Sequence, residues 1–186
     1  MKISGIEIRN FRGIEDVSIS FENDLICIVG RNDVGKSTVL KAIETFFAMR
    51  NFQFEDFPFR SEEGTKSIIE IIFETDNEEL EDYAIESKLY FRHTYEKSSE
   101  KILKRIECKK KFVPPTEDEL NEYKELKKIG TGLGVNFPKR KPDDKSIEEL
   151  RNKVREKIDK RIGSYFWFDI SNKWSSILKL LPEIII

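Results

Sequence analysis

The sequence predicts an α/β fold in which a mixed sheet packs against a helix that follows a glycine-rich loop. Three observations support this class. Strand-like patterns fill the first thirty residues, helical periodicity begins directly after the loop at residues 30–37, and more strand patterns follow at residues 68–73 and 88–112. A second stretch of helical periodicity within residues 113–163 predicts an inserted helical segment.

The composition is that of one folded domain or of part of a larger one. The 186 residues carry 33 Lys+Arg against 35 Asp+Glu, and the 38% of hydrophobic residues provide enough apolar mass for a core. This charge balance argues against attraction of the whole surface to nucleic acid, although it leaves a local basic patch open. The two cysteines predict neither a disulfide framework nor a zinc site.

The apolar runs of the chain are short. The run at residues 25–29 is far below the roughly 20 residues that a membrane helix needs. The segment Met1–Glu7 is interrupted by polar residues and lacks the small-residue cleavage site of a signal peptide. We therefore expect a cytoplasmic protein that does not span a membrane.

Three strands are expected before the loop. Ile6 and Ile8 alternate with charged residues, and apolar and polar residues also alternate over Val17–Phe21. These two patterns are typical of half-exposed strands. The continuous apolar run Leu25–Val29 instead predicts a central strand that is buried on both faces.

A helix is expected directly after Gly35. Its apolar side chains recur at helical spacing: Val39, Leu40, Ile43, Phe46 and Phe47. Residues 51–65 are irregular and rich in Phe, and a strand follows at residues 68–73. Residues 88–95 and 101–112 then predict a hairpin around the polar turn 96–100.

Two capping boxes predict two helices after the hairpin. Thr116 and Glu119 begin a short helix that ends near Gly130, and Ser146 and Glu149 begin a longer one that Gly163 closes. Residues 130–145 are expected to form a flexible connection, and residues 180–186 resemble the beginning of a buried strand.

The glycine-rich loop carries the clearest chemical signal. It matches the phosphate-binding (Walker A) pattern with both glycines, the lysine and the serine in place, over Gly30, Arg31, Asn32, Asp33, Val34, Gly35, Lys36 and Ser37. Backbone N–H groups of such a loop converge with the helix N-terminus on one anion site. Lys36 would contact the β- and γ-phosphates, Ser37 would offer an oxygen to Mg²⁺, and Thr38 would lie near the α-phosphate. The alternative is a chance match in a strand-to-helix turn.

A second cluster, Arg9-Asn10-Phe11-Arg12, directly follows the first strand pattern. By composition alone, its arginines are solvated charges at a sheet edge and Phe11 is a core residue. Together with the loop, however, the cluster resembles the opening of the N-terminal ATPase lobe of the RecF/SMC branch of ABC-type ATPases. This resemblance implies that Asn10 and Arg12 approach the bound ATP.

Within that branch, three further features resemble the OLD (overcoming lysogenization defect) family and its Gabija-type anti-phage relatives: the loop variant at residues 33–35, the aromatic segment Asp56–Arg60 and the strand pattern at residues 68–73. The resemblance is specific over residues 1 to about 75. It implies an ATP-dependent DNA endonuclease system in anti-phage defence or DNA repair.

Other parts of that family's machinery are not matched by the sequence. Walker B, the signature motif and the switch histidine would all follow residue 186, and Ile170 stands where a catalytic Glu would follow Asp169. We therefore interpret Asp169 as an ordinary polar residue and His93 as a surface or cross-strand residue. No carboxylate cluster of a Toprim nuclease is recognisable, so nuclease activity is not expected on this chain.

Two alternative functions stay open. A GTPase could share the loop letters, but its Asn-Lys-x-Asp motif is missing: the pairs at residues 152–153 and 172–173 lack the Asp. A DNA-binding, nucleotide-sensing module without turnover would use the basic residues of the hairpin: Lys97, Lys101, Lys104, Arg105, Lys109, Lys110 and Lys111. The glycines of residues 130–134 follow a helix, so we interpret them as a connector rather than as a second nucleotide loop.

The resulting hypothesis divides the chain into three parts. Residues 1–112 form a P-loop ATPase lobe, residues 113–163 a helical insertion, and residues 164–186 the start of the rest of an ATPase head. The lobe binds ATP and Mg²⁺, and self-association or a partner chain completes the head. We expect hydrolysis only where Walker B and the signature motif are supplied in this way.

Overall fold

The computed structural model describes residues 1–22, 27–29 and 35–181, and it divides into two compact units. The first unit comprises Met1–Lys110 and the chain from Trp167 onward. The second comprises Lys111–Phe166, which includes the segment expected as a helical insertion. Each unit has its own hydrophobic core.

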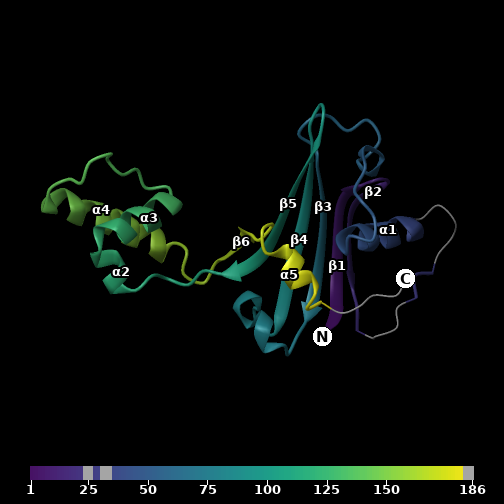
Figure 1. Ribbon diagram of the computed structural model, residues 1–186, viewed down its shortest axis with the longest axis horizontal. Coiled ribbons are helices and arrows are strands. Elements are labelled where there is room, and N and C mark those ends of the chain that lie inside the picture. Colours follow the sequence, from purple (N-terminus) through teal and green to yellow (C-terminus); the bar gives the residue numbers. More distant parts are fainter. Residues whose placement is uncertain (23–26, 30–34, 182–186) are drawn as a thin grey trace. The chain divides into compact units, whose positions relative to one another are not determined.

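A six-stranded sheet with the order β2-β1-β3-β4-β5-β6 organises the first unit (Figure 1). The strands are β1 (Lys2–Phe11), β2 (Ile14–Ser20), β3 (Lys66–Glu74), β4 (Lys88–Lys97), β5 (Ile102–Lys111) and β6 (Tyr165–Asp169). The α/β class, the strand over residues 68–73 and the hairpin over residues 88–112 are confirmed. The sequence predicted a mixed sheet; the four strand pairs from β2 to β5 are all antiparallel.

One face of this sheet carries the core. Successive side chains of a strand point to opposite faces, so alternate residues such as Ile6 and Ile8, or Ile69 and Ile71, are buried together. Helices α1 (Lys36–Phe46) and α5 (Trp174–Leu178) pack on this face, where the rings of Phe46 and Trp174 meet edge to face with centroids 5.4 Å apart. The sheet therefore fixes the position of α1, the helix that follows the predicted phosphate-binding loop.

The helix after Gly35 is confirmed, with one change in its buried face. Val39 and Phe46 lie in the core as predicted, but Leu40 is exposed. Ala42 and Thr45 are buried in addition. The buried stripe is therefore centred on residues 39, 42 and 46, which share one side of the helix at 3.6 residues per turn.

The predicted central strand at residues 25–29 is wrong within its described part. Residues 27–29 are not in a strand and Val29 is 90% exposed, whereas residues 25 and 26 lie outside the described residues. The described residues of this run pair with none of the six strands of the sheet. An apolar run specifies burial only where a partner strand is present.

His93 is buried rather than on the surface. It lies on β4 opposite Ile69 and Ile106, and its ring stacks on that of Phe46 at 4.3 Å. Burial, followed by the charge of Lys104, holds the pKa of His93 well below its usual value. The side chain therefore serves as a neutral aromatic member of the core.

Two short 3-10 helices connect the strands: η1 (Phe54–Asp56) and η2 (Glu78–Tyr83). The strand expected at residues 180–186 is wrong within its described part, because residues 180 and 181 lie in a turn that follows α5; residues 182–186 lie outside the described residues. Trp174 and Ile177 of α5 pack into the sheet core, which explains the apolar character of the tail.

The second unit is helical, with α2 (Glu117–Asn121), α3 (Tyr123–Gly132) and α4 (Asp144–Asp159). The capping box of Thr116 and Glu119 is confirmed. That of Ser146 and Glu149 is wrong, because Asp143 caps α4 by accepting a bond from the Ser146 N–H at 2.9 Å. Gly130 lies inside α3, not in a connector.

No helix in the described ranges is long and apolar enough to cross a membrane.

Candidate nucleotide-binding site

The phosphate-binding pattern falls on the N-terminus of α1. Gly35 is the N-cap residue and Lys36, Ser37 and Thr38 form the first turn. The other predicted loop residues, Gly30, Arg31, Asn32, Asp33 and Val34, lie outside the described residues. Gly35 has a φ of 85°, a left-handed conformation that glycine adopts without steric cost.

The N-terminus of α1 has the electrostatics of an anion site. Among the described residues no side chain caps it, and its first turn contains no acidic residue. The residue at its start is Lys36, whose charge repels the positive end of the helix dipole. Both features disfavour the helix by itself and favour a bound anion, so the residues fit the phosphates of a nucleotide.

The tight turn between β1 and β2 lies next to this helix start. A Cβ built on Gly35 would be 3.8 Å from a side-chain carbon of Ile14, the first residue of β2. Asn10 and Arg12 belong to this turn region and both have positive φ values, 51° and 54°. The structure thus places Gly35, at the start of α1, at the same end of β1 as Asn10 and Arg12.

Asn10 and Arg12 are held by different partners. The Asn10 side-chain amide donates to the carbonyl of Lys66 at 3.1 Å, which ties the end of β1 to the start of β3. The Arg12 Nε donates to Asp56 Oδ1 at 2.7 Å, and the Arg12 N–H donates to the Asp56 carbonyl at 2.8 Å. Arg12 is therefore fixed twice by one residue of η1.

Asp56 is the residue that sequence reasoning missed in this region. Its side chain is fully buried, and its other oxygen, Oδ2, accepts bonds from Arg50 Nη2 at 2.6 Å and from the Gln53 N–H at 2.8 Å. Burial raises the pKa of Asp56, but the Gln53 N–H and the two guanidinium groups outweigh it and hold the pKa below its usual value. The only sequence signal was its place in the segment Asp56–Arg60.

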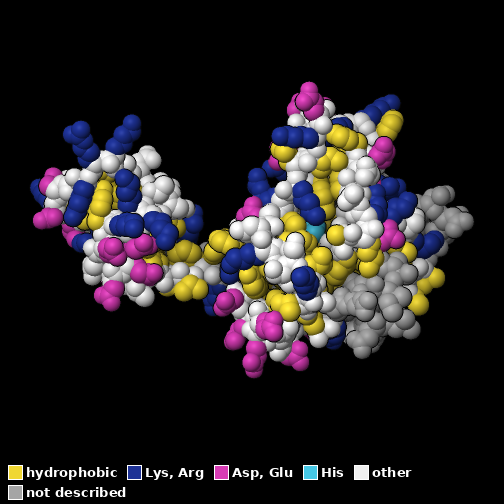
Figure 2. All heavy atoms as spheres, in the orientation of Figure 1, with side chains coloured by type: hydrophobic (Ala, Val, Ile, Leu, Met, Phe, Trp, Pro, Cys, Tyr) yellow, Lys and Arg dark blue, Asp and Glu magenta, His cyan; other side chains and the backbone are white. Residues whose placement is uncertain are grey.

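The basic residues of the hairpin do not form one continuous patch. Lys104 is opposite Tyr95 and Arg105 is opposite Thr94, so neighbouring basic residues point to opposite faces of the sheet. Lys109 lies over the ring of Tyr90 at 4.9 Å and Lys110 over that of Tyr83 at 4.7 Å. On the face shown in Figure 2, Lys and Arg side chains are interspersed with acidic and other residues.

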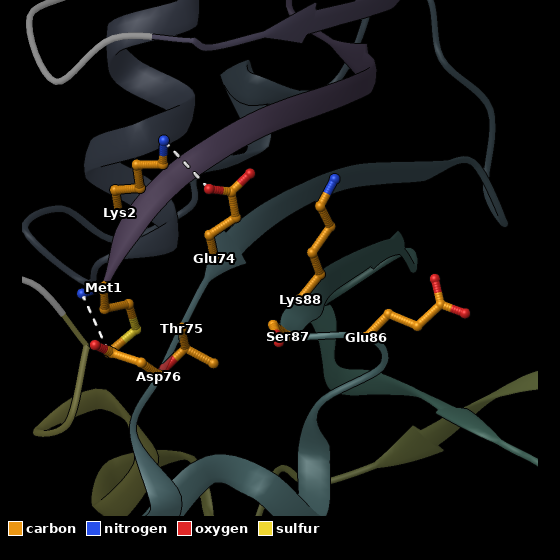
Figure 3. A pocket seen from close by; sticks show the side chains of 8 residues that line it. All are labelled: Met1, Lys2, Glu74, Thr75, Asp76, Glu86, Ser87 and Lys88. Carbon is orange, nitrogen blue, oxygen red and sulfur yellow. Dashed lines mark ion pairs between the residues drawn. The ribbon is translucent and has the colours of Figure 1, made fainter.

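A wide, open surface pocket of about 720 Å³ lies at the opposite end of β1 from Arg12 (Figure 3). Its lining includes Lys2 and Glu74, which form an ion pair at 3.2 Å. The ten residues of β1 place this pocket about 30 Å from the β1–β2 turn, because a strand rises about 3.3 Å per residue. The pocket is therefore separate from the candidate nucleotide site.

Asp169 is exposed at the end of β6 and accepts a bond from the Ser171 N–H at 2.8 Å, as expected of an ordinary polar residue that ends a strand. Within the described ranges, no group of three or more His, Cys, Asp and Glu side chains could hold a metal ion.

One family profile and several known proteins are similar to this chain. The sequence profile of the AAA ATPase domain family matches residues 1–180. The chain is 33% identical over 85 residues to the uncharacterised protein MJECL44 of Methanocaldococcus jannaschii, a match that covers 42% of this chain and 26% of that protein. It is 37% identical over 78 residues to the endonuclease GajA of Bacillus cereus, covering 41% of this chain and 13% of GajA.

The matched regions are thus about a quarter and about an eighth of these relatives. Among solved structures, one from work on ATP-driven dimerization and DNA-stimulated activation of SMC ATPases is similar, with a TM-score of 0.45 at 18% sequence identity. That similarity covers 85% of this chain and 99% of the SMC chain.

Proposed function

Because the chain belongs to the AAA ATPase domain family, we propose that it binds Mg-ATP at the N-terminus of α1 and is the nucleotide-binding lobe of an ATPase that regulates DNA processing. The observation that carries this proposal is the start of α1. A left-handed glycine, a first-turn lysine and the absence of acidic residues from that turn occur at the position of the phosphate-binding pattern.

Each residue of this turn has a role in the proposal. The N–H groups at the start of α1 and the Lys36 ammonium would bind the β- and γ-phosphates. Thr38 would lie near the α-phosphate, and the exposed Ser37 hydroxyl would offer an oxygen to Mg²⁺. When bound, Mg²⁺ would neutralise part of the phosphate charge. Arg12 and Asn10, at the adjacent turn, would contact the same nucleotide.

The role in DNA processing rests on similarity to the endonuclease GajA. The similarity supports an ATPase lobe that works with a DNA nuclease, and it does not extend to the nuclease itself, since only 13% of GajA is covered. Self-association or a partner chain would complete the ATPase head. The basic residues of β5 are a weaker proposal for DNA contact, because the strand divides them between two faces.

The experiment is calorimetric titration of Mg-ATP into the wild-type chain and into Lys36→Ala. We expect wild-type binding, and we expect Lys36→Ala to abolish it while the circular dichroism spectrum and thermal midpoint stay close to wild type. Lys41→Ala, on the same helix but beyond its first turn, is the matched control and should bind normally. Mg-ATP affinity retained in Lys36→Ala would contradict the proposal.

A further inference from the structure

Asp56 connects two parts of the fold through its two oxygens. Oδ1 accepts from Arg12, which lies in the β1–β2 turn, and Oδ2 accepts from Arg50, which follows α1. Arg50 also donates from Nη1 to the Thr45 hydroxyl in α1 at 2.7 Å. The buried carboxylate therefore ties the turn to the end of the helix whose other end carries Lys36.

The contact with Asp56 leaves the terminal nitrogens of the Arg12 guanidinium available to bind another group. The bond to Asp56 uses Nε, the nitrogen nearest the backbone, and leaves the two terminal nitrogens of Arg12 without a bond to Asp56. The Arg12 side chain is 31% exposed, whereas that of Asp56 is fully buried. Within residues 1–22, 27–29 and 35–181, no other acceptor receives a bond from this guanidinium.

The backbone supports the same arrangement. The Arg12 N–H donates to the Asp56 carbonyl at 2.8 Å, so η1 holds both the main chain and the side chain of Arg12. The positive φ of Arg12 is unfavourable for a residue with a Cβ, and these bonds offset that cost. Because Ile14 lies against Gly35, the fixed turn adjoins α1.

We propose that Asp56 is a positioning residue, which fixes the Arg12 guanidinium through Nε so that the terminal nitrogens face the phosphates of bound ATP. This inference rests on the proposed nucleotide site. It differs from a purely structural role for Asp56, in which the ion pairs only hold residues 50–60 in place. The two roles predict different coupling between Asp56 and Arg12 in ATP affinity.

A double-mutant cycle distinguishes the positioning role of Asp56 from the purely structural role. Mg-ATP affinity is measured for wild type, Asp56→Asn, Arg12→Ala and the double variant, and thermal unfolding is followed in parallel. We expect Asp56→Asn to weaken binding about tenfold, the effect of one charge-assisted hydrogen bond, when Arg12 is present. In the Arg12→Ala background it should change the affinity less than about twofold. Equal losses in both backgrounds, or no loss in a folded Asp56→Asn protein, would overturn the proposal.

A second variant decides the question even where Asp56→Asn does not fold. Arg12→Lys keeps the positive charge but cannot bond Asp56 through Nε while also extending further nitrogens outward. We expect it to lose as much Mg-ATP affinity as Arg12→Ala. Near-wild-type affinity in Arg12→Lys would show that charge alone suffices and would overturn the positioning role.

A matched control removes an ion pair of similar burial elsewhere. Glu107→Gln disrupts the pair of Glu107 and Arg92, whose side chains are 12% and 20% exposed, on the sheet face away from α1. Its Mg-ATP affinity should stay within about twofold of wild type. The Lys36→Ala variant shows which of the two proposals has failed. If it retains Mg-ATP affinity, the proposed nucleotide site itself is wrong. If it loses Mg-ATP affinity while the effects of substituting Asp56 and Arg12 are independent, only the positioning role of Asp56 is wrong.

Discussion

Asp56 and Glu70 are both buried carboxyl groups, and their surroundings move their pKa values in opposite directions. Asp56 receives bonds from two arginines and a backbone N–H, which hold its pKa below the usual value in spite of burial. Glu70 lies on β3 opposite Glu7 of β1 and Arg92 of β4. Burial, followed by repulsion from Glu7, raises the pKa of Glu70 to about 7.

These two shifts change the contribution of each carboxyl to stability in different pH ranges. Because the folded pKa of Asp56 is lowered, its contribution is present above its unfolded pKa of 3.8 and is lost as the pH falls below it. The folded pKa of Glu70 is raised from 4.5, so stability is lost as the pH rises from there through about 7.

Glu70→Gln tests this pH dependence. The variant removes the cost of ionising a buried carboxyl, so at pH 8 its free energy of unfolding should exceed that of wild type by about 3 kcal/mol. At pH 5, where the carboxyl is largely protonated in the folded protein but mostly ionised in the unfolded one, the two should differ by about 1 kcal/mol. Urea unfolding at both pH values measures this. A stabilisation that is the same at pH 5 and pH 8 would show that ionisation of Glu70 is not its cause.

Single residues also show which parts of the candidate site a sequence can predict. Lys36 and Gly35 were predicted because the chemistry of phosphate binding requires these residue types at a fixed spacing. Asp56 was not predicted as a partner of Arg12, because the two are 44 residues apart and only the folded chain brings them together. A buried carboxylate has no local pattern in the sequence.

At the scale of elements, the predictions succeeded where the periodicity reflects contacts within the same sheet or helix. The strands over residues 66–74 and 88–111 alternate because each has one face on the core. The strand predicted at residues 25–29 was wrong because a continuous apolar run indicates burial but does not specify which strand it would pair with. The start of α4 was misplaced because Asp143 and Ser146 are both good caps and only the geometry chooses between them.

Gly130 is an element-scale feature that tests the packing of the second unit. It lies in α3, and a Cβ at this position would be 2.4 Å from the ring of Phe137 and 2.7 Å from a methyl group of Val154 in α4. We expect Gly130→Ala to lower the free energy of unfolding of this unit by about 1–3 kcal/mol through overpacking. Gly132→Ala, in the same helix with no atom within 4 Å of its Cβ, is the control.

Hydrogen exchange by mass spectrometry checks this prediction unit by unit. Exchange should increase in residues 111–166 of Gly130→Ala and not in Gly132→Ala. Because the first unit has a separate core, its exchange and the Mg-ATP affinity should remain those of wild type. Wild-type exchange of the second unit in Gly130→Ala would show that α3 and α4 move apart at little cost.

At the scale of the whole molecule, the described residues of the candidate nucleotide site all belong to one of the two units. The first unit contains every described residue of the candidate nucleotide site, from Asn10 to Asp56. The second unit has its own core of leucine, valine and isoleucine and contributes none of these residues. The family could be inferred from residues 1 to about 75, since the phosphate-binding pattern and the Asn-Phe-Arg cluster are local, whereas the helical segment carries no motif that predicts a role.

The site on α1 is open enough to make association testable. Ser37 is exposed and Arg12 is partly exposed, so both could also meet a second protein surface that covers the nucleotide. We expect Mg-ATP to shift the mass measured by light scattering from near 21.9 kDa towards twice that value, because a nucleotide held between two lobes contributes contacts to both. The shift should be absent in Lys36→Ala and unchanged in Lys41→Ala. A monomer at saturating Mg-ATP would contradict self-association and would favour a different chain as the partner that completes the head.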